Sequence, residues 1–204
     1  QVKMKGSQFN EWYGYISEGL FQTQEDLNNS AKINNNVKVG DVKYKDISGP
    51  DGVPDGKISS EYDRILLGGS LPRYMFGGNV SAKYKGFDFS MAFQGVGSQL
   101  VRSNSMMIEP LGENWGNIPS ILDGKYWSSL KSEAENAKAR YPRLTRSNIS
   151  SNQDMSDFWL FNGRYVRLKN LTLGYTLPLS LTNKVSIDKI RIYASANDLF
   201  CLSK

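Results

Sequence analysis

The chain has 204 residues, and its 25 Lys and Arg against 20 Asp and Glu give a formal net charge of +5. The basic residues are scattered among acidic ones without a basic run, so we expect no nucleic-acid binding. The sequence has no histidine and one cysteine, which excludes Ser-His-Asp and Cys-His nucleophilic sites, His-ligated zinc and an internal disulfide from this chain alone.

The first seventy residues predict short elements and loops. The aromatic-rich stretch EWYGYISEGLF at 11–21 predicts a strand-like segment. The polar stretch at 22–36 predicts an exposed loop with one helical turn. From residue 40 to 73, Gly, Pro and Asp are dense enough to predict turns rather than long regular elements.

Residues 74–95, YMFGGNVSAKYKGFDFSMAFQG, predict two alternating strands around a turn at Lys85-Gly86. One face carries large apolar groups and the other carries polar ones. The apolar positions are Tyr74, Phe76, Val80, Ala82, Tyr84, Phe87, Phe89, Met91 and Phe93. Each arm has about 9–11 residues, the length that a tilted strand needs to cross a bilayer. A soluble β-sandwich shows the same alternation, so the hairpin alone leaves both open.

The stretch from Val96 to Phe161 has no sustained period of two. Good helix formers predict a helix from about residue 120 to 140, ended by Tyr141-Pro142. A connection of this length usually has a function or a structure of its own.

Alternation returns at 165–177, where Leu171, Leu173 and Tyr175 share a face. The phase reverses before Asn170, which predicts either a β-bulge near Lys169-Asn170 or the point where the strand leaves a membrane. A final strand is predicted at 187–197. Short and long connections therefore alternate, as in outer-membrane barrels with brief inner turns and long outer loops.

Several blocks recur in one order: FNEWYGYISEGLF, GDVKYKDISGPDGVPDGKISSEYDRILLG, YKGFD, FQGVG, YVRLKNLTLGYTLP and IRIYASANDLF. In this order they resemble the C-terminal barrel portion of SusC/RagA-type TonB-dependent outer-membrane transporters. The resemblance implies an all-β fold, an antiparallel transmembrane β-barrel segment from a 22-stranded barrel, with long extracellular loops and a short loop helix. It also implies residence in the bacterial outer membrane and no enzymatic activity.

The same resemblance implies a division of the chain. Residues 1–204 are expected to be a C-terminal fragment without the plug or the closing strand, and 22–73 and 96–161 are expected to be extracellular loops. The implied partners are a SusD-like surface lipoprotein, TonB through the N-terminal part that is missing here, membrane lipid and lipopolysaccharide, and a glycan or peptide substrate. No cofactor is required.

The acidic segment at 46–63 resembles the family's DxNxDG-type loop and predicts a Ca²⁺ site. Calcium loops need oxygen ligands at positions 1, 3 and 5 and a carboxylate that closes the cage. The candidate ligands are Asp51, Asp55, Ser59, Glu61 and Asp63. Position 3 is Val53, which has no side-chain oxygen, so a merely solvated acidic turn stays the alternative.

Four aromatic residues in or beside the long loop are candidates for substrate stacking: Trp115, Tyr126, Trp127 and Trp159. The alternative is a small loop core or a contact with the lid protein. Arg164, Arg167 and Lys169 are expected near the outer rim, facing lipopolysaccharide or the lid, or simply solvent. The lipid-facing set is Tyr74, Phe76, Phe87, Phe89, Met91, Phe93, Leu171, Leu173 and Tyr175.

The sequence thus predicts a transporter fragment that works by binding and passage rather than by catalysis. A soluble β-rich carbohydrate-binding module is the alternative from another functional class. A carboxylate-pair glycosidase is formally open, but no spacing of Asp and Glu singles out such a pair.

Overall fold

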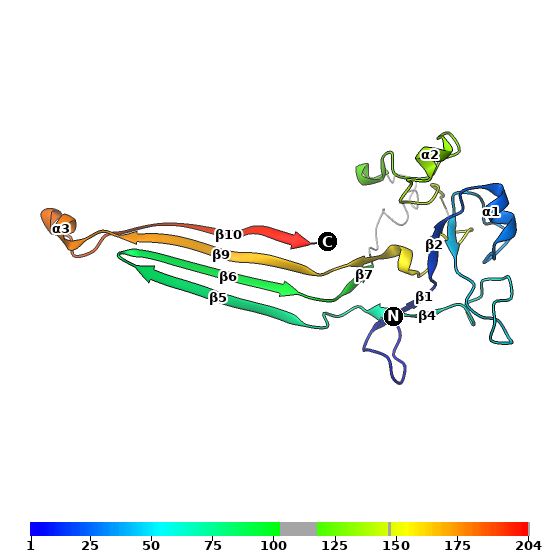
Figure 1. Cartoon of the computed structure of the whole chain (residues 1–204), viewed down its shortest axis with the longest axis horizontal. Helices are drawn as coiled ribbons and strands as arrows, with labels where there is room; N and C mark the ends of the chain where they lie inside the picture. Colours follow the sequence, from blue (N-terminus) through cyan, green and yellow to red (C-terminus); the bar gives the residue numbers. More distant parts are fainter. Residues whose placement is uncertain (103–117, 147, 204) are drawn as a thin grey trace. The chain divides into compact units, whose positions relative to one another are not determined.

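The computed structural model describes residues 1–102, 118–146 and 148–203. The chain divides into two compact units (Figure 1). The loop unit comprises Gln1–Ser70 and Val101–Phe161, and the sheet unit comprises Leu71–Leu100 and Asn162–Lys204.

The sheet unit is a single layer of four long antiparallel strands (Figure 1). The strands are β5 (Met75–Tyr84), β6 (Phe87–Val96), β9 (Tyr165–Thr176) and β10 (Arg191–Ser203), in the order β10-β9-β6-β5. The predicted hairpin and the predicted strand at 165–177 are confirmed. The bounds predicted for the last strand, 187–197, are wrong, because the strand starts at Arg191 and continues to Ser203.

A tight turn joins β5 to β6. Lys85 and Gly86 both have positive φ, 45° and 89°, the conformation of the two-residue turns whose twist matches that of paired strands. Glycine is needed at the second position, because a Cβ on Gly86 would stand 2.9 Å from the Thr176 carbonyl oxygen. The turn therefore fixes the register that pairs Tyr84 with Phe87.

The predicted phase slip in β9 is a β-bulge. Asn170 pairs with Ala92 while Leu168 pairs with the next residue, Phe93, so Lys169 is the extra residue of β9. One extra residue moves the side chains that follow to the opposite parity. Leu168 therefore shares a face with Phe93, although it has the opposite parity to Leu171.

The last strand bulges at the same level. Asn197 pairs with Asn170 and Phe200 pairs with Leu168, which leaves Asp198 and one neighbour opposite Lys169. Asp198 has a left-handed φ of 48°, a conformation that Asp tolerates better than most residues. This bulge explains why alternation read from the sequence ended at residue 197.

At the other end of these two strands, Pro178 follows β9 and a short helical connection leads to β10. It consists of α3 (Leu179–Thr182) and η3 (Asn183–Val185). Proline has no N–H to continue the ladder, so it ends the strand. Among the described residues, no helix has the length and apolarity needed to span a bilayer.

The loop unit contains short elements around two small cores. Its strand pairs are β1 (Glu11–Gly14) with β4 (Ile65–Gly69), and β2 (Ser17–Leu20) with β3 (Val42–Tyr44), while β7 (Leu100–Arg102) pairs with β8 (Leu160–Asn162). Its helical pieces are α1 (Gln24–Asn29), η1 (Ser120–Leu122), α2 (Glu133–Asn136) and η2 (Asp157–Trp159). The strand-like segment at 11–21 and the helical turn within 22–36 are confirmed.

The long helix predicted from about 120 to 140 is wrong. Only η1 and α2 are helical in that stretch, and α2 begins at a capping box between Ser132 and Glu135. Backbone pairing folds the rest into a closed loop: the Lys125 carbonyl accepts from the N–H groups of Arg140 and Tyr141, at 2.9 and 3.2 Å. These pairs outweigh the local helix propensity of the alanines.

Candidate functional site

The four strands of the sheet unit place large apolar side chains on one common face. Strand register aligns them in rows across the sheet. The rows are Tyr84–Phe87–Tyr175–Ile192, Ala82–Phe89–Leu173–Ala194 and Val80–Met91–Leu171–Ala196. The predicted lipid-facing residues thus lie on one surface, which we call the apolar face and which also includes Tyr74, Phe76, Phe93, Val166, Leu168, Phe200 and Leu202.

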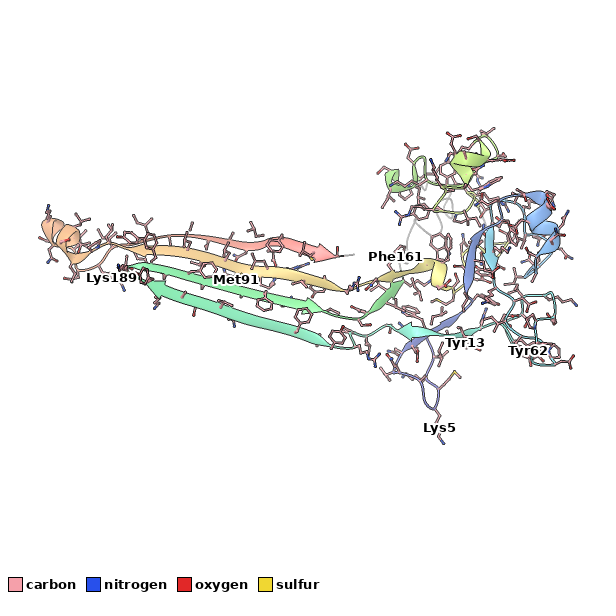
Figure 2. The ribbon with its side chains drawn as sticks, in the orientation of Figure 1. Lys5, Tyr13, Tyr62, Met91, Phe161 and Lys189 are labelled. Carbon is pink, nitrogen blue, oxygen red and sulfur yellow. The ribbon has the colours of Figure 1, made fainter. Side chains whose placement is uncertain are left out.

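No buried core covers this face within the described part of the chain. Both hydrophobic core clusters consist of loop-unit residues. Phe87 and Leu173 are each 55% exposed and Ile192 is 64% exposed, and Figure 2 shows side chains standing off β5, β6, β9 and β10, with Met91 on β6. The other residues named on this face are exposed or half-buried, except Leu168, which is 6% exposed. An exposed apolar surface of this extent marks contact with an apolar partner.

The dimensions of the apolar face fit a bilayer. Strands of ten residues are about 33 Å long at roughly 3.3 Å per residue. A tilt of about 40° reduces this to about 25 Å along the membrane normal, the height of the apolar band of outer-membrane barrels. Aromatic side chains occur near both ends, Tyr74 and Phe76 at one and Tyr84 and Tyr175 at the other, as in the aromatic girdles of such barrels.

The opposite face of the sheet is polar. One row consists of Ser81, Ser90, Thr172 and Ser195. Near the short turn, Arg191 of β10 reaches across β9 to Asp88 of β6, with Arg191 Nε 2.9 Å from Asp88 Oδ1. The ion pair passes over Gly174, where a Cβ would lie 2.6 Å from that oxygen. The two faces therefore suit two different solvents.

Both edges of this sheet are open in the described chain, because β5 and β10 each have one neighbour. An open edge leaves backbone N–H and C=O groups without partners. In hydrocarbon such groups must be paired. The two edges of the sheet are therefore able to pair with further strands.

The three basic residues predicted near the rim differ in their contacts. Lys169 Nζ lies 2.8 Å from Asp198 Oδ1, and Arg167 Nη1 lies 3.9 Å from the same oxygen. Arg164 directly precedes β9, is exposed, and has no ion pair with a described carboxylate. Its guanidinium is thus available to an anion.

Of the four aromatic candidates for substrate binding, Trp115 lies outside the described residues. Trp159 is 1% exposed, and its Nε1 donates to the Asn152 carbonyl oxygen at 2.6 Å. Its ring stacks on Tyr141 and meets Phe158 edge-on. Trp159 therefore forms part of a loop core, which was the alternative interpretation.

Trp127 and Tyr126 are placed differently. Trp127 packs against the larger core cluster under Gly40, where a Cβ would overlap the indole. It also lines a hollow of about 440 Å³ in the loop unit, whose polar lining includes Gln22, Lys131 and Glu133. Lys131 Nζ lies over the Tyr126 ring, 4.5 Å from the ring centre. An aromatic wall beside polar groups is a surface on which a sugar or peptide can bind.

Two of the predicted calcium ligands, Asp63 and Asp55, accept hydrogen bonds from backbone N–H groups. Asp63 is fully buried, and its carboxylate accepts from the N–H groups of Ile47, Ser48 and Ser59 at 2.8, 3.2 and 2.7 Å. Asp55 Oδ1 accepts from the Lys57 N–H at 3.0 Å.

No three His, Cys, Asp or Glu side chains of the described segments gather into a group that could hold a metal ion. Asp51 and Glu61, the remaining acidic candidates, are exposed. The calcium site stays a prediction that this geometry does not support, because backbone donors already satisfy the central carboxylate.

The sequence did not reveal the buried polar cluster that ties the loop unit together. Asp41 is fully buried, and its Oδ1 lies 2.6 Å from Arg143 Nε and accepts from Asn152 Nδ2 at 2.7 Å. Its Oδ2 accepts from the Lys38 N–H at 2.7 Å. The side-chain partners Arg143 and Asn152 stand more than 100 residues from Asp41 in the chain, so no local pattern indicates the cluster.

Burial and nearby charge shift the pKa values of Tyr44, Tyr15 and Asp26 in the loop unit. Burial raises the pKa of the Tyr44 phenol well above its ordinary value, and the Asp154 carboxylate adds to the rise. Burial likewise raises the pKa of Tyr15, against the opposing charge of Arg64. At Asp26, burial opposes ionisation, but the hydrogen bond and charge of Lys43 outweigh it and lower the pKa.

Comparison with known proteins gives a consistent set of relatives, although no protein-family model matches the chain. TonB-dependent receptor P3 of Formosa agariphila is 28% identical over 98% of this chain, and TonB-dependent receptor P26 of the same organism is 27% identical over 91%. The chain spans 18% and 17% of their lengths, under a fifth of each. These relatives are named as receptors, not as enzymes.

Solved structures show the same fold. The RagAB peptide transporter matches with a TM-score of 0.62 at 20% identity, and the RagAB peptide importer in the open-open state with 0.61 at 19%. Each match covers 95% of this chain and 19% of the other. The resemblance to a SusC/RagA-type TonB-dependent receptor fragment is therefore confirmed. The described chain is mostly strands with few helices, and its strands do not close into a barrel.

Proposed function

We propose that this chain is part of an outer-membrane TonB-dependent nutrient importer. The observation that carries the proposal is the apolar face: four strands long enough to cross a bilayer keep apolar side chains on one side and polar ones on the other. A soluble sandwich would cover the apolar side with a second sheet. The receptor relatives support the same conclusion.

In this proposal the sheet unit supplies four strands of a larger barrel, of 22 strands in proteins of this type, and the polar face lines its interior. The termini of β5, β6 and β9 that connect to the loop unit lie at the same end of the sheet, since Met75, Val96 and Tyr165 are paired in register. The opposite end of the sheet has the two-residue turn at Lys85-Gly86. Segments 22–73 and 96–161 then belong outside the cell, because such barrels have short inner turns.

The complete importer would act without a catalytic step and without a required cofactor. TonB would engage a part of the protein outside this chain, and a SusD-like lipoprotein would close the outer mouth. The cargo is an oligosaccharide or a peptide, and the hollow beside Trp127 is a place for the loops to touch it. The matched RagAB structures are described as those of a peptide importer, which favours peptides.

Membrane fractionation tests the proposal. The full polypeptide that carries this chain should sediment with the outer membrane and resist extraction by alkaline carbonate. Recovery in the soluble fraction would contradict it. The alternative, a soluble carbohydrate-binding module, is favoured only by the hollow at Trp127, and it predicts soluble protein that binds glycans without a partner.

A separate experiment tests the role of Trp127 in cargo binding. Replacing Trp127 with Ala should weaken binding of either an oligosaccharide panel or a peptide panel to the intact protein. Tyr62→Ala is the matched control, because Tyr62 is an exposed loop-unit aromatic residue that does not line the hollow. Equal binding by both variants would remove Trp127 from the proposal.

A further inference from the structure

A groove of about 360 Å³ lies at the end of the sheet unit where β5 and β9 begin and β6 and β10 end. Phe76, Val166 and Leu202 line it from the apolar face, and Arg164 lies beside them. The groove is thus continuous with the apolar face and has a cation at its rim.

Two glycines shape the groove: Gly95, which lies in β6, and Gly97, which follows that strand. A Cβ on Gly95 would stand 2.5 Å from Phe76 Cζ, and a Cβ on Gly97 would overlap the Tyr74 ring. The rings of Phe76 and Tyr74 therefore pack against the backbone at Gly95 and Gly97 and do not project perpendicular to the sheet. Phe76 is 43% exposed and Val166 is 37% exposed, so the lining is open to a ligand from the side of the apolar face.

Among the described residues that line this groove, Arg164 is the charged one. Lys169 and Arg167 both lie near the Asp198 carboxylate, whereas Arg164 has no ion pair with a described residue. Guanidinium groups bind phosphate oxygens through two parallel hydrogen bonds. A guanidinium without an ion pair to any described carboxylate, at the end of an apolar groove, complements a molecule with a phosphate at one end and an alkyl chain at the other.

We propose that this groove binds a membrane lipid with a phosphorylated headgroup, its phosphate on Arg164 and one acyl chain along Phe76, Val166 and Leu202. The inference rests on the proposed function, because only a membrane-embedded sheet offers this face to lipid. Two observations indicate this ligand: the positive charge of Arg164 complements a phosphate, and the groove is continuous with the apolar face.

The test uses the full polypeptide, purified in a non-ionic detergent and freed of lipid, with bound lipid counted by native mass spectrometry. The probes are lipid A, phosphatidylglycerol and inorganic phosphate, and the variant is Arg164→Gln. Loss of a charged hydrogen-bond partner should weaken binding of the preferred lipid about tenfold. Arg167→Gln, which removes the same charge three residues away on the polar face, should change it less than about twofold.

A second variant tests the acyl part of the site. Val166→Phe fills the groove and keeps Arg164, so it should weaken lipid binding without changing the affinity for inorganic phosphate. Unchanged lipid affinity in Arg164→Gln and Val166→Phe would overturn the proposal, as would inorganic phosphate that binds as tightly as lipid. These outcomes differ from failure of the proposed function, which would appear as a polypeptide absent from the outer-membrane fraction.

Discussion

The two units of this chain place their large hydrophobic side chains in opposite ways. In the loop unit Tyr15, Phe21 and Trp159 are at most 2% exposed, whereas Phe87 and Leu173 of the sheet unit are more than half exposed. The loop unit is a small structure with a buried interior of its own. The sheet unit leaves its apolar face uncovered by the described residues, and the proposed function places that face against an apolar medium.

The largest expected effect is in the buried polar cluster of the loop unit. Asp41→Ala leaves the Arg143 guanidinium without its buried partner and should cost about 3–5 kcal/mol of loop-unit stability. Hydrogen exchange of the loop-unit amides in the intact protein measures the cost. Glu18→Ala is the control, since its exposed carboxylate lies 3.9 Å from Lys43 Nζ and such pairs contribute about 0–1 kcal/mol. Equal effects would mean that the cluster does not hold the unit.

The next effect belongs to the apolar face. Leu171→Lys places a charge near the middle of that face and should destabilise the inserted sheet by about 2–4 kcal/mol. Thr172→Lys, one residue further along the same strand but on the polar face, should have little effect. The folded fraction in liposomes, read from the heat-dependent gel shift of the full polypeptide, compares the two. A similar loss of folded fraction in both variants would contradict the assignment of one apolar and one polar face.

A smaller effect tests the ion pair on the polar face. A Cβ at Gly174 would lie 2.6 Å from Asp88 Oδ1 and 2.7 Å from Arg191 Nη2. Gly174→Ala should therefore cost about 1–3 kcal/mol through overpacking, and the loop unit should keep its hydrogen-exchange protection. In the double variant with Asp88→Ala the penalty of Gly174→Ala should fall. An unchanged penalty would place its origin elsewhere.

The smallest effect at neutral pH is confined to the loop-unit core. Because burial raises the pKa of Tyr44 in the folded state, its phenol stabilises the fold fully below the unfolded value of 10.0 and less as the pH rises above it. Loop-unit stability should therefore decline above about pH 10. Tyr44→Phe should flatten that decline, although it also removes a hydrogen bond to the Ser151 carbonyl. An identical alkaline slope in Tyr44→Phe would contradict the assignment.

The parts of the fold that could be predicted from the sequence are those with a regular spacing of apolar residues. The apolar face repeats every second residue, so the hairpin at 74–95 and the phase slip near Lys169 could be predicted from the sequence, although only the strand register shows that the slip is a β-bulge. The extension of β10 to Ser203 was not, because the left-handed Asp198 breaks the alternation. The loop unit was hardest, since backbone pairs between 125 and 141 displaced a locally favoured helix.

The candidate sites show the same limit. Composition marked Trp127 and Trp159 equally as loop aromatics, and only the packing separates a buried core ring from one that lines a hollow. The carboxylate of Asp63 resembled a calcium ligand in sequence, yet in space it accepts three backbone N–H groups. Asp41 and Arg143 lie too far apart in the chain for any local signal to join them.

Spin-label accessibility along β6 tests the central claim most directly. With Cys201 replaced by Ser, single cysteines from 87 to 94 in the membrane-inserted full polypeptide carry the label. We predict that collisions with dissolved oxygen peak at Phe87, Phe89, Met91 and Phe93 and fall at the residues between them, while a water-soluble nickel chelate reaches none of the four peaks. Flat profiles, or chelate access at those four positions, would contradict a lipid-facing sheet.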